Sequence, residues 1–220
     1  MIIVGLTGSI GMGKTTTAAA FRRLGIPVHD ADRVVHGLTA PGGKILPTIE
    51  KAFPGSVIAG RLDRAGLGKR VFDDPKALAR LEAILHPQVR AAKLDFLDNA
   101  ARRREPIVVL DIPLLFEKGS DKWCDVVVVA SAPPSIQARR VLARPGMTPA
   151  KLAAVLGRQV SDRIKRRRAD FIVDTGLGLS YAFRQVRRIV VQFRNRRGTS
   201  WPFRGRMGRL RADARTVRGT

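Results

Sequence analysis

Residues 8–15 read GSIGMGKT and match the pattern G-x-x-x-x-G-K-[ST]. An apolar run, 2–6, precedes the match, and a stretch typical of a helix follows it. This order predicts a strand, a loop and a helix, in which backbone N–H groups converge on a polyphosphate. Because glycine has no Cβ atom, Gly8, Gly11 and Gly13 let the chain wrap closely around such an anion.

The end of this loop predicts the chemistry of a nucleoside triphosphate site. A helix that begins near Lys14 directs its unpaired N–H groups and its positive dipole end at the phosphates. We expect the Lys14 ammonium to contact the β- and γ-phosphates and the Thr15 hydroxyl to bind Mg²⁺. The pattern also occurs in glycine-rich turns with a solvated lysine, but its position at a first strand-to-helix turn favours nucleotide binding.

The composition is typical of one soluble globular domain with small insertions, with 220 residues of which 45% are hydrophobic and 27% charged. We expect neither export nor a membrane span, because the sequence shows no basic segment before a long apolar one and no run of about 18 apolar residues. Cys124 is the single cysteine and cannot form an internal disulfide, which fits a reducing cytoplasm and a small, partly buried side chain.

The net charge of +23 raises nucleic acid as a partner, but the distribution of the charge argues against it. Residues 194–220 contain nine arginines and one acidic residue, and their few apolar residues predict a disordered tail. Much of the remaining excess lies between Arg139 and Arg168, where a kinase that binds two anionic substrates needs it. Aromatic residues, which stack on bases, make up only 5% of the chain, so we expect no specific nucleic-acid partner.

Two carboxylates, Asp30 and Asp32, follow a second short strand that begins at Val28. Ligands of open α/β sheets bind at the carboxyl ends of the strands, so either carboxylate is placed to accept a proton from a substrate hydroxyl or to orient Mg²⁺-bound water. Alternatively, the pair caps the helix from Arg33 onward, or Asp30 alone caps it.

A long, mostly helical block, 41–104, lengthens the connection after this strand. Asp63 is placed as the N-cap of one helix, and Pro75 as the first residue of another. We expect His86 and Pro87 to end that helix and Pro87 to open a further one, because proline disrupts a helix interior. The block predicts an inserted substrate-binding subdomain.

Three more apolar runs complete the predicted sheet. The run 107–110 ends at Asp111, as expected of a buried parallel strand with a carboxylate at its tip, and Asp111 is a candidate Mg²⁺ ligand. The segment IPLLFE follows and ends at Glu117, which we expect to face the cleft. Runs 125–130 and 171–173 supply the last two strands. Strands alternating with helices predict a three-layer α/β/α fold with a mostly parallel, five-stranded sheet.

A pair of arginine-rich helices, 134–168, predicts a lid that closes over phosphates. Thr148 is placed to cap the second helix, which we expect to run to Arg166. Arg139 and Arg144 are the candidates for phosphate contact, because the planar guanidinium can hold phosphoryl oxygens with two parallel hydrogen bonds. The other arginines read as a solvated helix face.

The order of these motifs resembles the dephospho-coenzyme A kinase family over residues 1–193. The motifs are GLTGSIGMGKTT, DAD, LHP at 85–87, DIPLLFE, the arginine-rich lid with RQ at 158–159, and AD before the last strand. The resemblance implies transfer of the ATP γ-phosphoryl group to the ribose 3′-hydroxyl of dephospho-CoA, the last step of coenzyme A synthesis. It also implies a nucleoside-kinase-like core with a P-loop, a CoA-binding helical insert and a mobile lid.

The resemblance also implies roles for individual residues. Asp32 would be the general base for the 3′-hydroxyl, Lys14 would act on the phosphates, and Arg139 would act from the lid. The residues implied for the acceptor site are Asp32, His86, Leu115 and Glu117. The residues implied for ATP are Gly8, Gly11, Met12, Gly13, Lys14, Thr15, Thr16 and Arg144.

Three positions depart from the family pattern. Ser9 and Met12 stand where the family commonly has Gly and Ser, and neither change removes a phosphate-binding glycine. The turn 174–176 stands where the family often has Asn near the adenine. We expect this turn to lie beside the phosphate-loop strand and a final helix to cover 180–193.

Rival functions can be weighed on the same residues. Another small P-loop kinase would share the loop but not the combination of the insert 41–104 with the DAD motif. A nucleic-acid-binding NTPase is motivated by the charge alone. A P-loop scaffold without turnover is disfavoured, since Lys14, Thr15 and Asp32 are all present.

Overall fold

A computed structural model describes residues 1–72, 74–193 and 196–202. They form two compact units, which we describe separately: a first unit of residues 1–29 and 99–202, and a second unit of residues 30–98. Among the described residues, no helix is both long and apolar enough to span a bilayer.

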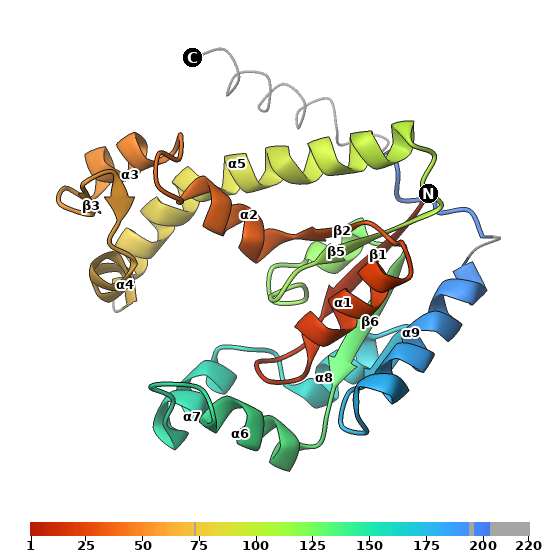
Figure 1. The fold of residues 1–220 in the computed structure, drawn as a ribbon. Coiled ribbons are helices and arrows are strands. Elements are labelled where there is room, and N and C mark those ends of the chain that lie inside the picture. Colours follow the sequence, from red (N-terminus) through yellow and green to blue (C-terminus); the bar gives the residue numbers. More distant parts are fainter. Residues whose placement is uncertain (73, 194–195, 203–220) are drawn as a thin grey trace. The chain divides into compact units, whose positions relative to one another are not determined.

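The first unit is built on a five-stranded sheet with the order β2-β5-β1-β6-β7 (Figure 1). The pairs β1–β5, β1–β6 and β6–β7 are parallel. Parallel strands need crossover connections, which the helices between them supply. The predicted mostly parallel, five-stranded α/β fold is confirmed. The strands are β1 (Ile2–Thr7), β2 (Val28–Asp30), β5 (Ile107–Asp111), β6 (Val126–Ser131) and β7 (Phe171–Asp174).

One face of this sheet packs against two helices, α1 (Lys14–Arg23) and α9 (Leu179–Phe193). Alternate residues of β1 point to this face, because successive side chains of a strand lie on opposite sides. Helix α9 contributes a stripe with helical spacing, which predicts one buried side. The buried stripe consists of Ala182, Val186, Ile189, Val190 and Phe193.

The opposite face packs against the segment that follows β5. Leu115 is fully buried and clusters with Val127 and Val129 of β6. Gly5, in the middle of β1, is held so closely to Cys124 that an added Cβ atom would lie 2.6 Å from its Sγ atom. A side chain at this position would therefore push the two layers apart. Cys124 is half-buried and forms no disulfide, as predicted.

The lid region contains three helices where two were predicted: α6 (Pro134–Leu142), α7 (Pro149–Gly157) and α8 (Asp162–Arg168). Thr148 caps α7 by accepting a hydrogen bond from the Lys151 backbone N–H, as expected. The predicted continuation to Arg166 is wrong. The helix ends at a glycine, which has low helix propensity, and Ser161 then caps a new helix by accepting from the Ile164 N–H.

The carboxylate of Asp125 joins the two described ends of the first unit. It accepts hydrogen bonds from the Ile3 N–H at 2.8 Å and from the Thr199 and Ser200 N–H groups at 2.7 and 2.8 Å. This arrangement differs from the disorder predicted for 194–220, at least over the described residues 196–202. The rest of that predicted tail, 203–220, lies outside the described residues together with 194–195.

The second unit is mostly helical and has its own apolar core, with a two-stranded hairpin between the helices (Figure 1). Asp63 caps α4 by accepting from the Gly66 N–H at 3.0 Å, as predicted. The core consists of Ile45, Ile49, Phe53, Leu67 and Val71. The elements are α2 (Ala31–Leu38), α3 (Leu46–Ala52), β3 (Val57–Ile58), β4 (Arg61–Leu62), α4 (Arg64–Phe72) and α5 (Pro75–Arg102).

Helix α5 corrects the expectation that the helix after Pro75 ends at Pro87. It is a single helix of 28 residues with Pro87 inside it. Pro87 donates no hydrogen bond, but Ile84 and Leu85, in the turn before it, pack on the core of the second unit. Burial of this apolar face holds the helix together where intrinsic propensity would end it.

Candidate active site

The phosphate loop lies between the last residue of β1 and the first residue of α1, as its motif predicts. Gly11 and Gly13 have φ angles of +75° and +84°, a region that residues with a Cβ atom seldom adopt. A Cβ atom on Gly8 would lie 2.7 Å from the backbone oxygen of Ala130. Met12 is buried, and its Sδ atom accepts a hydrogen bond from the Ala132 N–H at 3.1 Å.

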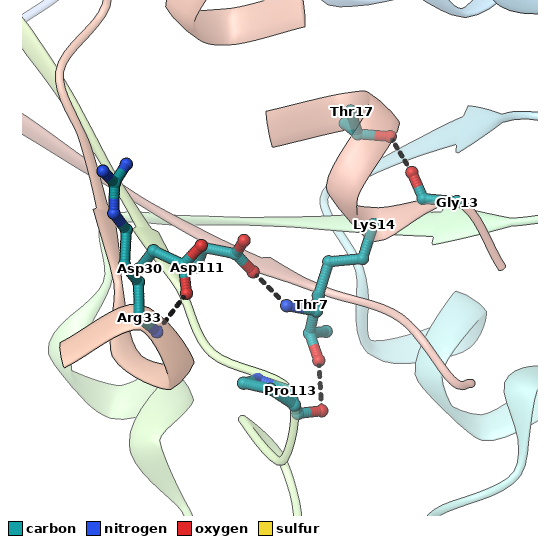
Figure 2. A network of polar contacts seen from close by, with 8 residues as sticks. All are labelled: Thr7, Gly13, Lys14, Thr17, Asp30, Arg33, Asp111 and Pro113. Atoms are coloured by element: carbon teal, nitrogen blue, oxygen red, sulfur yellow. Dashed lines mark hydrogen bonds and ion pairs between the residues drawn. The ribbon is translucent and has the colours of Figure 1, made fainter. Parts of the chain in front are cut away.

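Lys14 and Asp111 form an ion pair at the mouth of this loop (Figure 2). Lys14 is the first residue of α1 and Asp111 the last of β5, so the pairing of β1 with β5 brings them together. The Nζ to Oδ1 distance is 2.6 Å, with Asp111 buried and the lysine side chain 16% exposed. The lysine side chain is thus paired with a buried carboxylate and remains partly exposed to solvent.

The three threonines that follow Lys14 differ in what their hydroxyls can do. Thr17 is buried and donates to the Gly13 carbonyl at 3.1 Å, which closes the first turn of α1 (Figure 2). Thr16 is half-buried, and Thr15 is exposed at the start of the helix. The Thr15 hydroxyl and the Asp111 carboxylate are hard oxygen donors, the kind that Mg²⁺ prefers.

Helix α6 of the lid holds the backbone of the loop from one side. Gln137 donates through Nε2 to the Ile10 carbonyl at 2.7 Å. Arg140 donates through Nη1 to the Gly11 carbonyl at 3.4 Å and, with both of its terminal nitrogens, to Thr175 at 2.9 and 2.7 Å. These bonds tie the loop carbonyls to a second element of the unit.

The turn 174–176 holds the loop from a third element. Thr175 donates its hydroxyl to the Met12 carbonyl at 2.9 Å, and a Cβ atom on Gly13 would lie within 2.6 Å of Thr175 Oγ1. The expectation that this turn lies beside the phosphate-loop strand is wrong, because β6 separates β7 from β1 in the sheet. The turn reaches the loop itself instead.

Glu117 makes a second ion pair, with Lys165 of α8 at 3.0 Å. Its Oε1 atom also accepts from the Val160 N–H at 2.9 Å. Burial alone would raise the pKa of the Glu117 carboxyl, but the N–H groups of Glu117 and Val160 and the Lys165 ammonium outweigh burial and lower this pKa below 4.5. Glu117 is therefore an anion held inside the protein.

In the second unit, Asp30 and Asp32 have separate roles. Asp30 caps α2 by accepting a hydrogen bond from the Arg33 N–H at 3.0 Å, so the capping alternative holds for Asp30 alone (Figure 2). Asp32 is exposed in the first turn of α2, and its carboxylate makes no hydrogen bond or ion pair within the described residues of its own unit. His86 is exposed on α5.

Comparison with known proteins identifies the family. The dephospho-CoA kinase family model matches residues 2–179. The chain belongs to the dephospho-CoA kinase family. A dephospho-CoA kinase of Mesorhizobium japonicum is 55% identical over 90% of this chain and 100% of its own length. The resemblance noted in the motifs is thus confirmed.

Two solved structures support the fold assigned to this dephospho-CoA kinase family member. The protein TT1252 of Thermus thermophilus has a TM-score of 0.76 at 37% identity, covering 87% of this chain and 96% of its own. Dephospho-CoA kinase of Campylobacter jejuni has a TM-score of 0.63 at 24% identity, covering 86% and 96%.

The structure also places the remaining candidate residues of this family member. The Leu115 side chain is fully buried and packs with Val127 and Val129 of β6. Arg139 and Arg144 are exposed, and neither side chain makes a hydrogen bond or ion pair to the described residues of the loop. Arg140 makes the contact instead. The signal that could have found it is the buried face of α6, formed by Gln137 and Val141, on which Arg140 also lies.

Proposed function

We propose that this chain transfers the γ-phosphoryl group of ATP to the ribose 3′-hydroxyl of dephospho-CoA, giving coenzyme A and ADP. The observation that carries the proposal is the 55% identity to a dephospho-CoA kinase over that relative's full length. The intact phosphate loop, with Lys14 and Thr15 at the start of α1, supports the same reaction. The single cysteine, Cys124, forms no disulfide, which fits a cytoplasmic enzyme.

The proposed ATP site uses the loop backbone and the two side chains at its end. Lys14 has three N–H donors, so it can keep Asp111 as a partner while it donates to a phosphate oxygen. Thr15 and Asp111 are the proposed Mg²⁺ ligands, directly or through water. When bound, Mg²⁺ would neutralise charge on the β- and γ-phosphates. The full set proposed for ATP is Gly8, Gly11, Met12, Gly13, Lys14, Thr15, Thr16 and Arg144.

The second unit is the proposed source of the acceptor site. Asp32 is the proposed general base, since its carboxylate is exposed whereas that of Asp30 is committed to the cap of α2. In the reaction, the 3′-oxygen forms a bond to the γ-phosphorus as its proton passes to Asp32. The bond from that phosphorus to the β–γ bridging oxygen breaks, and ADP leaves. His86 is proposed to border the acceptor.

The lid, 134–168, is proposed to supply arginine and to exclude water. Closure over bound ATP would limit hydrolysis and bring Arg144 to the phosphates, where charge develops during transfer. Arg139 keeps its proposed role from the family resemblance. Arg140 has a different proposed role, because its guanidinium already holds the loop backbone and Thr175.

The experiment that tests this function measures ADP release with MgATP, with and without dephospho-CoA, while mass spectrometry follows the acceptor. We expect ADP release that depends on the acceptor and a product heavier by one phosphoryl group. ATP binding without this product would contradict the proposal and favour another hydroxyl acceptor.

The base assignment has its own test in a matched pair of variants. Asp32→Asn should lower kcat by at least about 100-fold and leave KM for ATP unchanged, because proton transfer in the transition state is lost. Asp30→Asn should retain kcat within about twofold, since asparagine also caps helices. Equal losses in the two variants would argue against Asp32 as the base.

A further inference from the structure

The ion pair of Glu117 with Lys165 lies outside the groups that the proposed reaction uses. The Lys165 side chain is 0% exposed and that of Glu117 is 14% exposed. The contact is a pairing of charges rather than a directed hydrogen bond, because Lys165 Nζ has no well-aligned acceptor among the described residues. Burying an ammonium is unfavourable unless its partner is fixed.

The first thing that the pair holds is the linker between α7 and α8, residues 158–161. Glu117 Oε1 accepts from the backbone N–H of Val160 in the middle of this linker. Lys165 lies one turn into α8, which starts directly after the linker. One carboxylate thus fixes both the linker and the helix that follows it.

The linker in turn holds the phosphate loop. Gln159, the residue before Val160, accepts through its Oε1 atom a hydrogen bond from the Ile10 N–H at 3.1 Å. Gln137 donates to the carbonyl of the same residue, so both the N–H and the C=O groups of Ile10 are hydrogen-bonded. A shift of the linker would remove one of these two bonds.

We infer that Glu117 and Lys165 are positioning residues that set the affinity for the ATP phosphates by fixing Gln159 against Ile10, an inference that rests on the proposed kinase function. Neither residue touches a substrate in this scheme. A phosphate loop binds through backbone N–H groups that must be preset, so loosening the loop weakens phosphate binding. This role replaces the acceptor contact expected of Glu117 from its motif.

Two variants test the inference. Gln159→Ala removes the bond to the loop at a half-buried position in the linker. The paired change Glu117→Gln with Lys165→Met removes both charges, so that neither is left alone inside the protein. The measurements are the Kd for ATP by calorimetry, KM for ATP and for dephospho-CoA, and the thermal unfolding midpoint.

We expect each variant to raise Kd and KM for ATP about fivefold, the effect of one lost hydrogen bond, and to leave KM for dephospho-CoA unchanged. Combining the two should raise Kd little further, because both act through the same contact. The matched control is Asp121→Asn, which removes an exposed pair with Arg168 of the same helix and should leave Kd unchanged.

Other outcomes overturn the inference. A rise in KM for dephospho-CoA with unchanged ATP affinity would restore Glu117 to the acceptor site. A lowered unfolding midpoint with unchanged Kd would reduce the pair to a structural role, as would fully additive losses in the combined variant. Calorimetry keeps this test separate from the proposed function, because a wild-type chain that binds ATP without phosphorylating dephospho-CoA fails only the latter.

Discussion

Two lysine–carboxylate pairs lie at the two ends of the segment 111–117, and they differ in their access to solvent. The Lys14 side chain is 16% exposed beside buried Asp111, whereas Lys165 is 0% exposed beside Glu117. A partly exposed lysine can take a phosphate as a further partner, but a fully buried one cannot. The same kind of ion pair is therefore proposed to serve a substrate at Lys14 and the protein itself at Lys165.

The largest expected effect comes from the exposed pair. Lys14→Met should lower kcat/KM by about 100- to 1,000-fold, because a charged donor to the transferring phosphoryl group is lost. Steady-state assay of coenzyme A formation measures this change. Activity within tenfold of wild type would contradict the proposal that Lys14 acts on the substrate while Lys165 serves only the protein itself.

The sealed pair should respond in stability instead. Lys165→Met alone leaves Glu117 as an uncompensated buried charge and should lower the free energy of unfolding by about 3 kcal/mol. Urea unfolding without nucleotide measures it. The paired change with Glu117→Gln should recover a large part of this loss. A paired variant no more stable than Lys165→Met would contradict the electrostatic explanation.

Two neighbouring arginines of α6 allow a similar comparison, between a side chain that contacts the loop and one that does not. Arg140→Ala should lower kcat/KM for ATP about tenfold, because one contact to the loop and two to Thr175 are lost. Arg139→Ala should lower kcat but leave KM for ATP unchanged, since its exposed side chain makes no contact with the loop and its proposed role is in the transfer step. The same steady-state assay separates the two variants, and a rise in KM for ATP in Arg139→Ala would contradict this contrast.

The smallest effect should appear in acid. The pKa of Glu117 is lowered on folding, so its stabilising contribution is complete above about pH 4.5 and is lost as pH falls through the folded-state value. The stability advantage of wild type over the paired Glu117→Gln and Lys165→Met variant should therefore shrink below pH 4.5. Urea unfolding across pH 3 to 7 measures this difference. A constant difference over that range would contradict the lowered pKa.

The parts of the fold that follow from local chemistry were predictable. The loop glycines, the cap at Thr148 and the buried strand before Asp111 depend on neighbours within a few residues. The hydrophobic runs, and the turn and cap residues between them, therefore predicted the strands of the sheet. Pro87 was misjudged because burial of the helix face, a tertiary effect, outweighs a local signal.

The site was predictable only where its residues belong to the motif. Glu117 pairs with a lysine 48 positions later, and no local sequence pattern predicts that contact. Arg139 and Arg140 differ by about 100° around the helix, so choosing between them requires knowing which face of α6 meets the loop. The residue pattern left Asp30 and Asp32 as alternatives that only the family resemblance separated, and the cap of α2 shows that the Asp30 carboxylate is engaged.

The carboxylate of Asp125, which binds both Ile3 and Thr199, brings two distant parts of the chain side by side. Gly198 is packed directly against the carbonyl of Met1. A short linker could therefore join these parts, and new ends could be opened at the exposed turn at Gly25. In such a circular permutant the ribosome would make β1, the phosphate loop and α1 last, after the lid helices and the turn that hold the loop.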